Sequence, residues 1–204
     1  MNVPPQAPTA PPSLQEARKA FARNHICEAA RDLFHRQGYA ATTLEQIAQA
    51  AGTRRTTLYS HFADKAEILE VIGRSYYSGL GQIIETLPGP VPTRAAIDTW
   101  IDDLVAFVVR ERTPATLLIG LGVSHDTPPV MQSVARTFQE ALAARLPAFA
   151  LAERPEPEYA SVRAYAKIIV RELGLGCLEA AREEGDGRAL LVIVADMFER
   201  FVRE

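Results

Sequence analysis

The sequence has few cysteines and no long apolar run. Its 204 residues contain two cysteines, Cys27 and Cys177, which cannot build a disulfide framework and form no CxxC pair. We therefore expect two free thiols in a reducing cytoplasm. No apolar stretch approaches the roughly 18 residues that a membrane span requires, so we expect no membrane partner.

Patterns typical of catalysis are also missing. No cluster of His, Cys and carboxylate residues has metal-ligand spacing, and we expect neither a metal nor a cofactor. No nucleophile–base pair and no Gly-rich phosphate loop occurs, so we expect no catalytic residues and no enzyme. Two alternatives stay open: an enzyme whose N-terminal helices are vestigial, and a purely structural or protein-binding helical dimer.

The charge is nearly balanced and slightly asymmetric. The formal net charge is -3, which excludes a basic nucleic-acid coat protein. Residues 1–70 carry a balance of +1 and residues 71–204 a balance of -4. The first residues, MNVPPQAPTAPPS, are rich in proline and lack the basic start and apolar core of a signal peptide. We expect residues 1–13 to be a disordered arm.

Helix start signals recur along the rest of the chain. Ser13-Leu14-Gln15-Glu16 and Thr43-Leu44-Glu45-Gln46 are capping boxes, and Asp64 begins a similar pattern. No segment shows the alternation of a strand bounded by hairpin turns. The sequence predicts an all-α fold with helices at about 14–36, 44–50, 54–61, 65–87, 94–112, 114–120, 130–146, 158–184 and 188–203.

The segment from 23 to 69 is the most informative part of the chain. Three short helical patterns lie there, with a small-residue turn, Ala51-Gly52-Thr53, between the second and the third. That layout predicts a helix-turn-helix in residues 14–63, which presents the start of its last helix to the major groove of double-stranded DNA. Arginine can pair with guanine, threonine methyls can contact thymine, and flanking polar groups can contact phosphates. The candidate DNA-binding residues are Thr43, Thr53, Arg54, Arg55, Thr56, Thr57, Tyr59, His61 and Lys65.

At these spacings the chain resembles the tetracycline-repressor-like (TetR) family of bacterial transcriptional regulators. The resemblance runs through Ile26, Ala29, Ala30, Leu33, Phe34, Gly38, Tyr39, Thr42, Thr43, Ile47, Ala48, Ala51, Gly52, Leu58, Tyr59, His61, Phe62, Lys65 and Leu69. It implies a protein of nine or ten helices and a homodimer. It also implies repression of a nearby operon that a small ligand relieves.

Two positions depart from the family pattern. Arg54 stands where the family usually has a capping residue such as serine, so we expect the cap to shift to Thr53. Thr56 stands where the family often has glycine, which lets the backbone approach a phosphate closely. Neither change blocks DNA binding, and both make the operator sequence harder to infer.

Residues 64–204 are expected to form a ligand-binding and dimerisation domain. Apolar stripes at three- and four-residue steps on the last two helices are typical of a four-helix bundle between two subunits. The candidate interface residues are Val162, Tyr165, Ile169, Leu173, Leu190, Val194, Met197 and Phe201, although such stripes could also pack inside one subunit. Gly174 and Gly176 would allow close approach.

The earlier helices of this domain are expected to enclose an effector pocket. Apolar and aromatic walls suit a hydrophobic or aromatic ligand, although an aromatic stripe is more often core than pocket. The candidate lining residues are Tyr76, Trp100, Leu104, Phe107, Leu117, Leu118, Leu121, Phe138, Leu142 and Tyr165. The sequence thus predicts a cytoplasmic, homodimeric transcriptional regulator, a repressor that a small effector releases from its operator. The effector, the operator and the choice between repression and activation are not encoded in any motif.

Overall fold

A computed structural model of the chain describes residues 13–122, 128–183 and 185–203, without the side chains of 132–135. Within these ranges the chain is helical and has no strand, so the predicted all-α fold is confirmed. The elements are α1 (Leu14–Gln37), α2 (Leu44–Ala50), α3 (Arg55–Tyr59), α4 (Lys65–Thr86), α5 (Arg94–Arg110), α6 (Arg112–Gly122), α7 (Pro129–Arg145), α8 (Pro147–Ala152), η1 (Pro157–Tyr159), α9 (Ala160–Arg182) and α10 (Gly187–Arg203).

The predicted helix starts agree with local capping. Ser13 and Thr43 each form a complete capping box, and the Asp64 side chain accepts a hydrogen bond from the Glu67 backbone N–H. These side chains satisfy backbone donors that would otherwise be unpaired at a helix start. Apart from Ser13, the Pro-rich arm expected at 1–13 lies outside the described residues.

Two expectations about the helices are wrong. The third helix ends at Tyr59 rather than near 61, and an additional short helix, α8, follows α7. Pro147 cannot continue α7 because its ring removes an N–H donor, but proline fits the first turn of a new helix. Between the seventh and eighth predicted helices, the sequence interpretation placed a loop at Pro155 and Pro157 and did not use Pro147.

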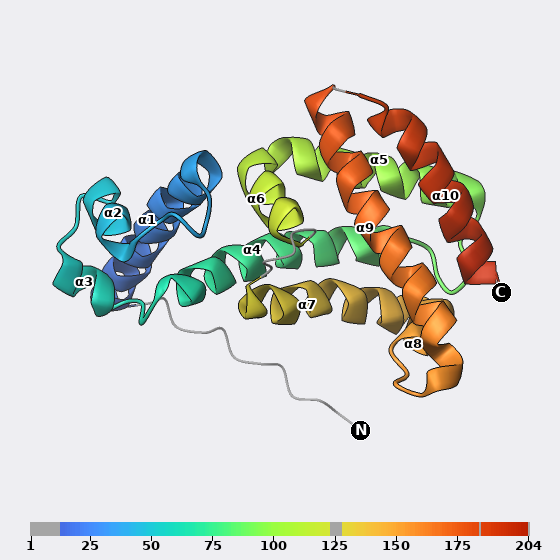
Figure 1. The fold of residues 1–204 in the computed structure, drawn as a ribbon, viewed down its shortest axis with the longest axis horizontal. Coiled ribbons are helices and arrows are strands. Elements are labelled where there is room, and N and C mark those ends of the chain that lie inside the picture. The colour runs from blue at the N-terminus through green and yellow to red at the C-terminus, as the bar shows by residue number, and fades with distance from the viewer. Residues whose placement is uncertain (1–12, 123–127, 184, 204) are drawn as a thin grey trace.

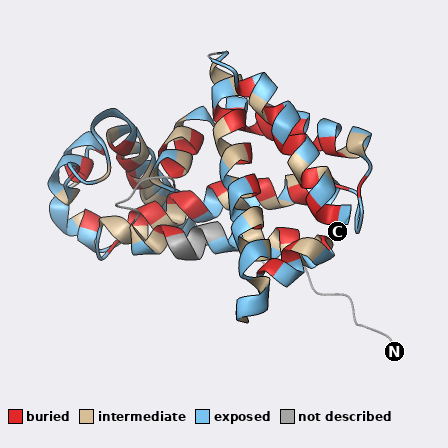
Figure 2. Ribbon diagram, turned by 45° about the vertical axis from the view of Figure 1, so that its right-hand side comes forward, coloured by how far each residue is buried: buried red, intermediate tan, exposed pale blue. Residues whose placement is uncertain are grey.

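The helices form an elongated arrangement with α4 as its axis (Figure 1). Helices α1–α3 lie at one end, and α4 runs from them into the group formed by α5–α10. The buried sides of the helices face one another and the exposed sides face outward (Figure 2). Among the described residues, no helix combines the length and apolarity needed to cross a membrane.

Trp100 lies at the centre of the C-terminal core. Its side chain is 1% exposed, and its ring centroid is 5.3 Å from that of Phe198 on α10. Its indole Nε1 donates a hydrogen bond to the Ile83 carbonyl on α4, at 3.1 Å. One side chain of α5 therefore contacts both α4 and α10, which fixes the far end of the axial helix.

Candidate DNA interface and ligand cavity

The turn between α2 and α3 has the conformation that the sequence predicted. Gly52 has a φ of 58°, a region that favours glycine because a side chain would be strained there. The Thr53 N–H donates to the Ala48 carbonyl at 2.9 Å and closes the turn. Ile47 and Leu58 are fully buried beneath it, so packing fixes α3 against α2.

The start of α3 differs from the expected cap. The N-cap residue is Arg54, in extended conformation, and no side chain caps the helix. The expected shift of the cap to Thr53 is therefore wrong. Because Thr53 is part of the turn itself, it precedes the N-cap position, and the first N–H groups of α3 have no side-chain acceptor.

The candidate DNA-binding residues differ in exposure. Thr43, Arg54, Arg55, Thr56 and Tyr59 are exposed. Thr53, Thr57, His61 and Lys65 are half-buried. The exposed group shares one end of the molecule, at the start of α2 and along α3.

Arg55 makes several contacts in the absence of DNA. Its guanidinium lies 2.8 Å from a carboxylate oxygen of Glu45 and donates to the Tyr59 hydroxyl at 3.3 Å. It also lies over the Tyr59 ring, 5.4 Å from the centroid. All three contacts are exposed, so they orient the side chain and are individually weak.

Lys65 joins α4 to the α1–α2 connection. Its Nζ donates to the backbone carbonyls of Tyr39, Ala40 and Thr42, at 2.8, 3.0 and 3.1 Å. An ammonium group has three donors, so these three carbonyls satisfy it and leave no donor for a phosphate in this conformation.

Arg23 makes a second link that the sequence interpretation missed. Its guanidinium donates to the His61 carbonyl, lies 3.0 Å from Glu67 and stacks 4.1 Å from the centre of the Phe62 ring. It therefore ties α1 to the start of α4. No local pattern marks it, because Glu67 is 44 residues away in sequence.

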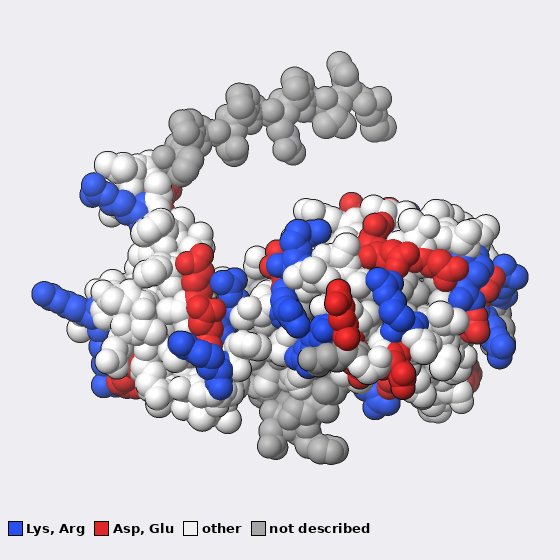
Figure 3. Space-filling view, turned by 90° about the horizontal axis from the view of Figure 1, so that it is seen from above, with Lys and Arg blue, Asp and Glu red and all other residues white. Residues whose placement is uncertain are grey.

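Charge over the rest of the surface is mixed. In the view of Figure 3, basic and acidic side chains alternate over the larger end of the molecule, and no single-sign patch covers it. The distribution of charge over the surface therefore does not locate a DNA site. The argument for a DNA site rests on the exposed candidate side chains of α2 and α3.

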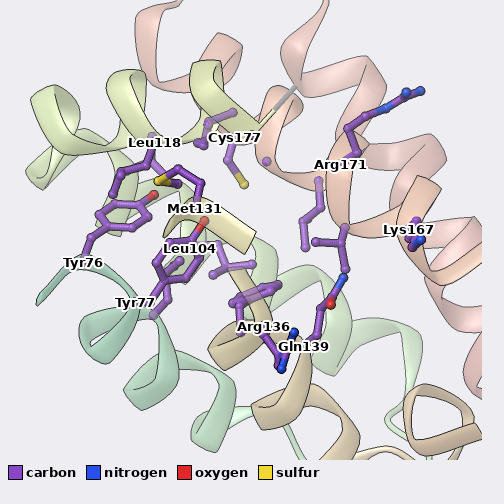
Figure 4. A pocket seen from close by; sticks show the side chains of 18 of the residues that line it. Tyr76, Tyr77, Leu104, Leu118, Met131, Arg136, Gln139, Lys167, Arg171 and Cys177 are labelled. Atoms are coloured by element: carbon purple, nitrogen blue, oxygen red, sulfur yellow. The ribbon is translucent and has the colours of Figure 1, made fainter. Parts of the chain in front are cut away.

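A cavity of about 810 Å³ lies among α4, α5, α6, α7 and α9 (Figure 4). This volume is within the range of small-molecule sites. Apolar and aromatic side chains form much of its wall, including Leu80, Leu104, Leu118, Met131 and Phe138. Tyr76 and Tyr77 of α4 lie against these residues, and Figure 4 places polar side chains from α7 and α9 on the other side.

Four of the ten candidate lining residues line this cavity, namely Tyr76, Leu104, Leu118 and Phe138. The other six are outside its lining: Trp100, Phe107, Leu117, Leu121, Leu142 and Tyr165. Trp100 belongs to the core described above, and Tyr165 packs against Phe201 with ring centroids 5.4 Å apart. Residues that line the cavity but were not predicted include Tyr77, Arg136, Lys167 and Arg171.

Burial keeps the two tyrosines and the cysteine of the cavity lining neutral. Desolvation raises the pKa of the Tyr77 hydroxyl to about 12, and it raises the pKa of Tyr76 further. It also raises the pKa of the Cys177 thiol to about 12. At neutral pH the two tyrosines therefore present phenol hydroxyls, which can donate hydrogen bonds, and no phenolate.

A second crevice, of about 340 Å³, lies between α1, α4 and the α5–α6 junction. Cys27 and Arg31 of α1, Gly79 of α4 and Phe107 of α5 line it. Tyr76 lines this crevice as well as the cavity. The Tyr76 side chain therefore lies between the cavity and the crevice that α1 borders.

Comparison with known proteins supports this reading of the N-terminal helices. Residues 26–72 match the model of the family described as "Bacterial regulatory proteins, tetR family". The transcriptional regulator AcrR of Shigella flexneri is 39% identical over 69 residues, which are 34% of this chain and 31% of AcrR. The chain thus spans about a third of that relative's length.

Two solved structures extend the similarity to most of the fold. The TetR-family repressor FadR of Thermus thermophilus, in complex with lauroyl-CoA, is 20% identical, with a TM-score of 0.54 over 88% of this chain and 92% of FadR. SmeT in complex with triclosan is 24% identical, with a TM-score of 0.57 over 86% of this chain and 90% of SmeT. At these identities the similarity establishes the shared fold alone.

The similarity to the tetR family is shown for residues 26–72. The resemblance inferred from the sequence is confirmed over these residues. The tetR-family match ends at Ile72, inside α4, whereas Tyr76 and the rest of the cavity lining lie beyond it. The family match therefore covers the helix-turn-helix and the first part of α4, and it does not extend to the cavity.

Helices α9 and α10, at the end of the chain, pack against each other. A Cβ at Gly176 would lie 2.9 Å from the Leu191 side chain, so glycine permits the close approach of α10. Four of the eight candidate interface residues are buried inside the subunit: Ile169, Leu173, Val194 and Phe201. The other four are half-buried: Val162, Tyr165, Leu190 and Met197.

The exposed apolar side chains of these helices lie one position away from the buried ones. Ile168 on α9 is 42% exposed and Ile193 on α10 is 57% exposed. Leu190, Ile193 and Met197 share one face of α10, because residues three and four apart lie on the same side of a helix. Since Leu190 also borders Gly176 of α9, this face adjoins α9.

Proposed function

We propose that the protein is a homodimeric transcriptional repressor that a small organic effector releases from its DNA operator. The observation that carries the proposal is the combination of a tetR-family helix-turn-helix, with Arg54, Arg55, Thr56 and Tyr59 exposed on α3, and a separate cavity of about 810 Å³. We divide the chain into a DNA-binding domain at 14–63 and an effector and dimerisation domain at 64–204. Acting on genomic DNA places the protein in the bacterial cytoplasm.

A gel shift with the DNA upstream of its own gene tests this function. We expect specific binding that falls steeply as salt rises, because basic side chains displace condensed counterions from the phosphates. The effector probes are lauroyl-CoA and triclosan, the ligands that two solved neighbours contain. A protein that binds no DNA fragment more tightly than random DNA at any salt concentration contradicts the proposal.

Within the DNA-binding domain, we propose that Thr43, Thr53, Arg54, Arg55, Thr56, Thr57, Tyr59 and His61 contact the operator. We assign Lys65 to anchoring α4, because its three donors are engaged by backbone carbonyls. For the dimer we propose the outward face formed by Ile168 of α9 and by Leu190, Ile193 and Met197 of α10, since these side chains retain exposed surface. Twofold symmetry would then present two copies of α3 to successive major grooves.

Replacing Arg55 by alanine is expected to weaken specific operator binding by about 1–3 kcal/mol if the guanidinium pairs with a base. Fluorescence anisotropy with operator and random duplexes measures the loss. A loss that is equal on both duplexes assigns Arg55 to phosphate, and unchanged binding removes it from the interface. Arg74→Ala, an exposed arginine on α4, is the matched control and should bind like the wild type.

Glu45 sharpens this test. Because Glu45 pairs with Arg55 in the free protein, Arg55 must exchange that carboxylate for DNA. Glu45→Gln should therefore strengthen operator binding while Arg55 is present and have less effect beside Arg55→Ala. If the changes in binding free energy of the two single substitutions simply add in the double variant, Glu45 does not affect operator binding through Arg55.

Helix α4 is the proposed route from cavity to DNA. Its first residue, Lys65, is bound to the α1–α2 connection, and its middle, at Tyr76 and Tyr77, lines the cavity. Tyr76 also contacts the crevice beneath α1. An effector that displaces Tyr76 would tilt α4 and change the spacing of the two α3 helices, a coupling of typically ~1–3 kcal/mol.

A spin label at Gln49→Cys on α2 is expected to report that movement as a change in the distance between the two subunits. Labelling can be selective, because burial raises the pKa of Cys27 to about 11 and that of Cys177 to about 12, so both thiols react slowly at neutral pH. Pulsed dipolar spectroscopy compares the operator-bound protein with the protein saturated with whichever probe releases it. Identical distance distributions would exclude the α4 mechanism.

A further inference from the structure

The polar side of the cavity has one sign of charge. Arg136 of α7 and Lys167 and Arg171 of α9 line it, together with the uncharged Gln139. Its described lining contains no aspartate or glutamate. The sign is opposite to that of the whole chain, whose formal net charge is -3.

Helix periodicity puts the polar lining residues of α7 and of α9 on the cavity side of each helix. Lys167, Arg171 and Gly174 follow at steps of four and three residues on α9, and Arg136 and Gln139 are three apart on α7. Such spacing puts each set on one side of its helix. Figure 4 shows Lys167 and Arg171 on the side opposite Tyr76, Tyr77 and Leu118, with the Arg171 guanidinium directed away from the tyrosines, and Arg136 beside Gln139 lower in the view. The cavity therefore has an apolar side that carries the tyrosines, and the cations border it at separate points on the other side.

Among the described residues, two of the three cations have no ionic partner. Arg171 lies 2.7 Å from the Glu172 carboxylate. Neither Arg136 nor Lys167 forms a salt bridge or a hydrogen bond with any residue in the described ranges. No acidic side chain in these ranges offsets the charges of Arg136 and Lys167, so they would attract an anionic group of a ligand in the cavity.

The apolar side adds two neutral donors. The Tyr76 and Tyr77 hydroxyls have no hydrogen-bond partner within the described part of the chain, and Figure 4 shows both tyrosines at the cavity. Neutral hydroxyls do not repel a negative charge, and they can donate to an oxygen on the body of a ligand.

We infer that the effector is an amphipathic organic anion, with an apolar or aromatic body and one carboxylate, sulfonate or phosphate group. The body lies among Tyr76, Leu104, Leu118 and Phe138, and the anionic group lies between Arg136 and Lys167. This inference rests on the proposed function, because it treats the cavity as the effector site. Its test uses purified protein without DNA, so it can fail or succeed independently of the gel shift.

Two fluorescent probes that differ by a single charged group provide the test. These are 8-anilinonaphthalene-1-sulfonate, which is anionic, and N-phenyl-1-naphthylamine, which lacks the sulfonate. At low ionic strength we expect either Arg136→Gln or Lys167→Gln to weaken binding of the anionic probe by about threefold, and the double variant by about tenfold. Binding of the neutral probe should stay unchanged, which also shows that the variants are folded.

Salt and a surface lysine provide the controls. Raising the ionic strength should weaken the anionic probe in the wild type and leave the neutral probe unaffected, because exposed charges are screened. Lys19→Gln on α1 is the matched control and should bind both probes normally. Equal losses of both probes in the cationic variants, or no loss of the anionic probe, would overturn the inference.

A cavity-filling variant tests whether the two probes bind inside the cavity. A Cβ at Gly174 would lie 3.8 Å from Ile119, an ordinary contact, so Gly174→Phe can direct its ring into the cavity without a clash at its base. This variant should lose binding of both probes. Retained binding of the anionic probe would place it outside the cavity and would also overturn the inference.

Discussion

Replacing Ile193 by glutamate is expected to separate the proposed dimer into monomers and to lower operator affinity by about 100-fold or more. Ile193 is 57% exposed on the outward face of α10, between Leu190 and Met197. A carboxylate at position 193 would be desolvated in an apolar interface without gaining a hydrogen-bond or ionic partner. Two DNA-binding domains held in one dimer gain about two to four orders of magnitude through avidity, and a monomer loses that gain.

Val192 offers a control of equal exposure. It is also 57% exposed, but it follows Arg188 by one helical turn, and Arg188 pairs with Asp102 of α5. Val192 therefore faces the α5 side of α10, and Val192→Glu should remain dimeric and bind operator normally. Sedimentation velocity measures the assembly and fluorescence anisotropy the DNA affinity. A dimeric Ile193→Glu variant, or a monomeric Val192→Glu variant, would move the interface to another face.

Replacing Trp100 by alanine is expected to lower the free energy of unfolding by about 3–5 kcal/mol. The indole is 1% exposed, packs on Phe198 and satisfies the Ile83 carbonyl. Its removal leaves a large cavity between α4, α5 and α10 and an unpaired backbone acceptor. Chemical denaturation followed by circular dichroism measures the change.

Two comparisons separate packing from ligand binding at this position. Trp100→Phe keeps most of the apolar volume and should cost less than the alanine variant. Val109→Ala, at a residue of the same helix that is 53% exposed, should change stability by no more than about 0.5 kcal/mol. If Trp100→Ala is stable but loses binding of both naphthalene probes, Trp100 belongs to the ligand site and not to the core.

The DNA-binding end could be predicted in detail because its signals are local. The capping boxes at Ser13 and Thr43, the Gly52 turn and the buried Ile47 and Leu58 all lie within a few residues of their partners. The cap of α3 was predicted wrongly, because the turn hydrogen bond from Thr53 to Ala48 removed Thr53 from the cap position. The anchoring role of Arg23 required a contact across 44 residues and had no local signal.

The cavity could be predicted only in part. An apolar helix position is consistent with a core, a cavity wall or a subunit interface, and the sequence does not separate these environments. Trp100 and Tyr165 were expected at the ligand and lie outside the cavity lining, while Arg136 and Lys167 line it without having been expected there. Polar residues at a cavity look like solvated surface in the sequence, since their spacing is that of any exposed helix face.

The sequence by itself determined the helices, the helix-turn-helix and the family of the N-terminal domain, because hydrogen bonds between neighbouring residues and short-range packing set these features. Only the tertiary structure decided which apolar stripes are buried inside the subunit, which apolar side chains stay exposed, and that three cations line one cavity. The physical reason is that burial and charge neighbourhood depend on how α4, α7, α9 and α10 pack across long sequence separations.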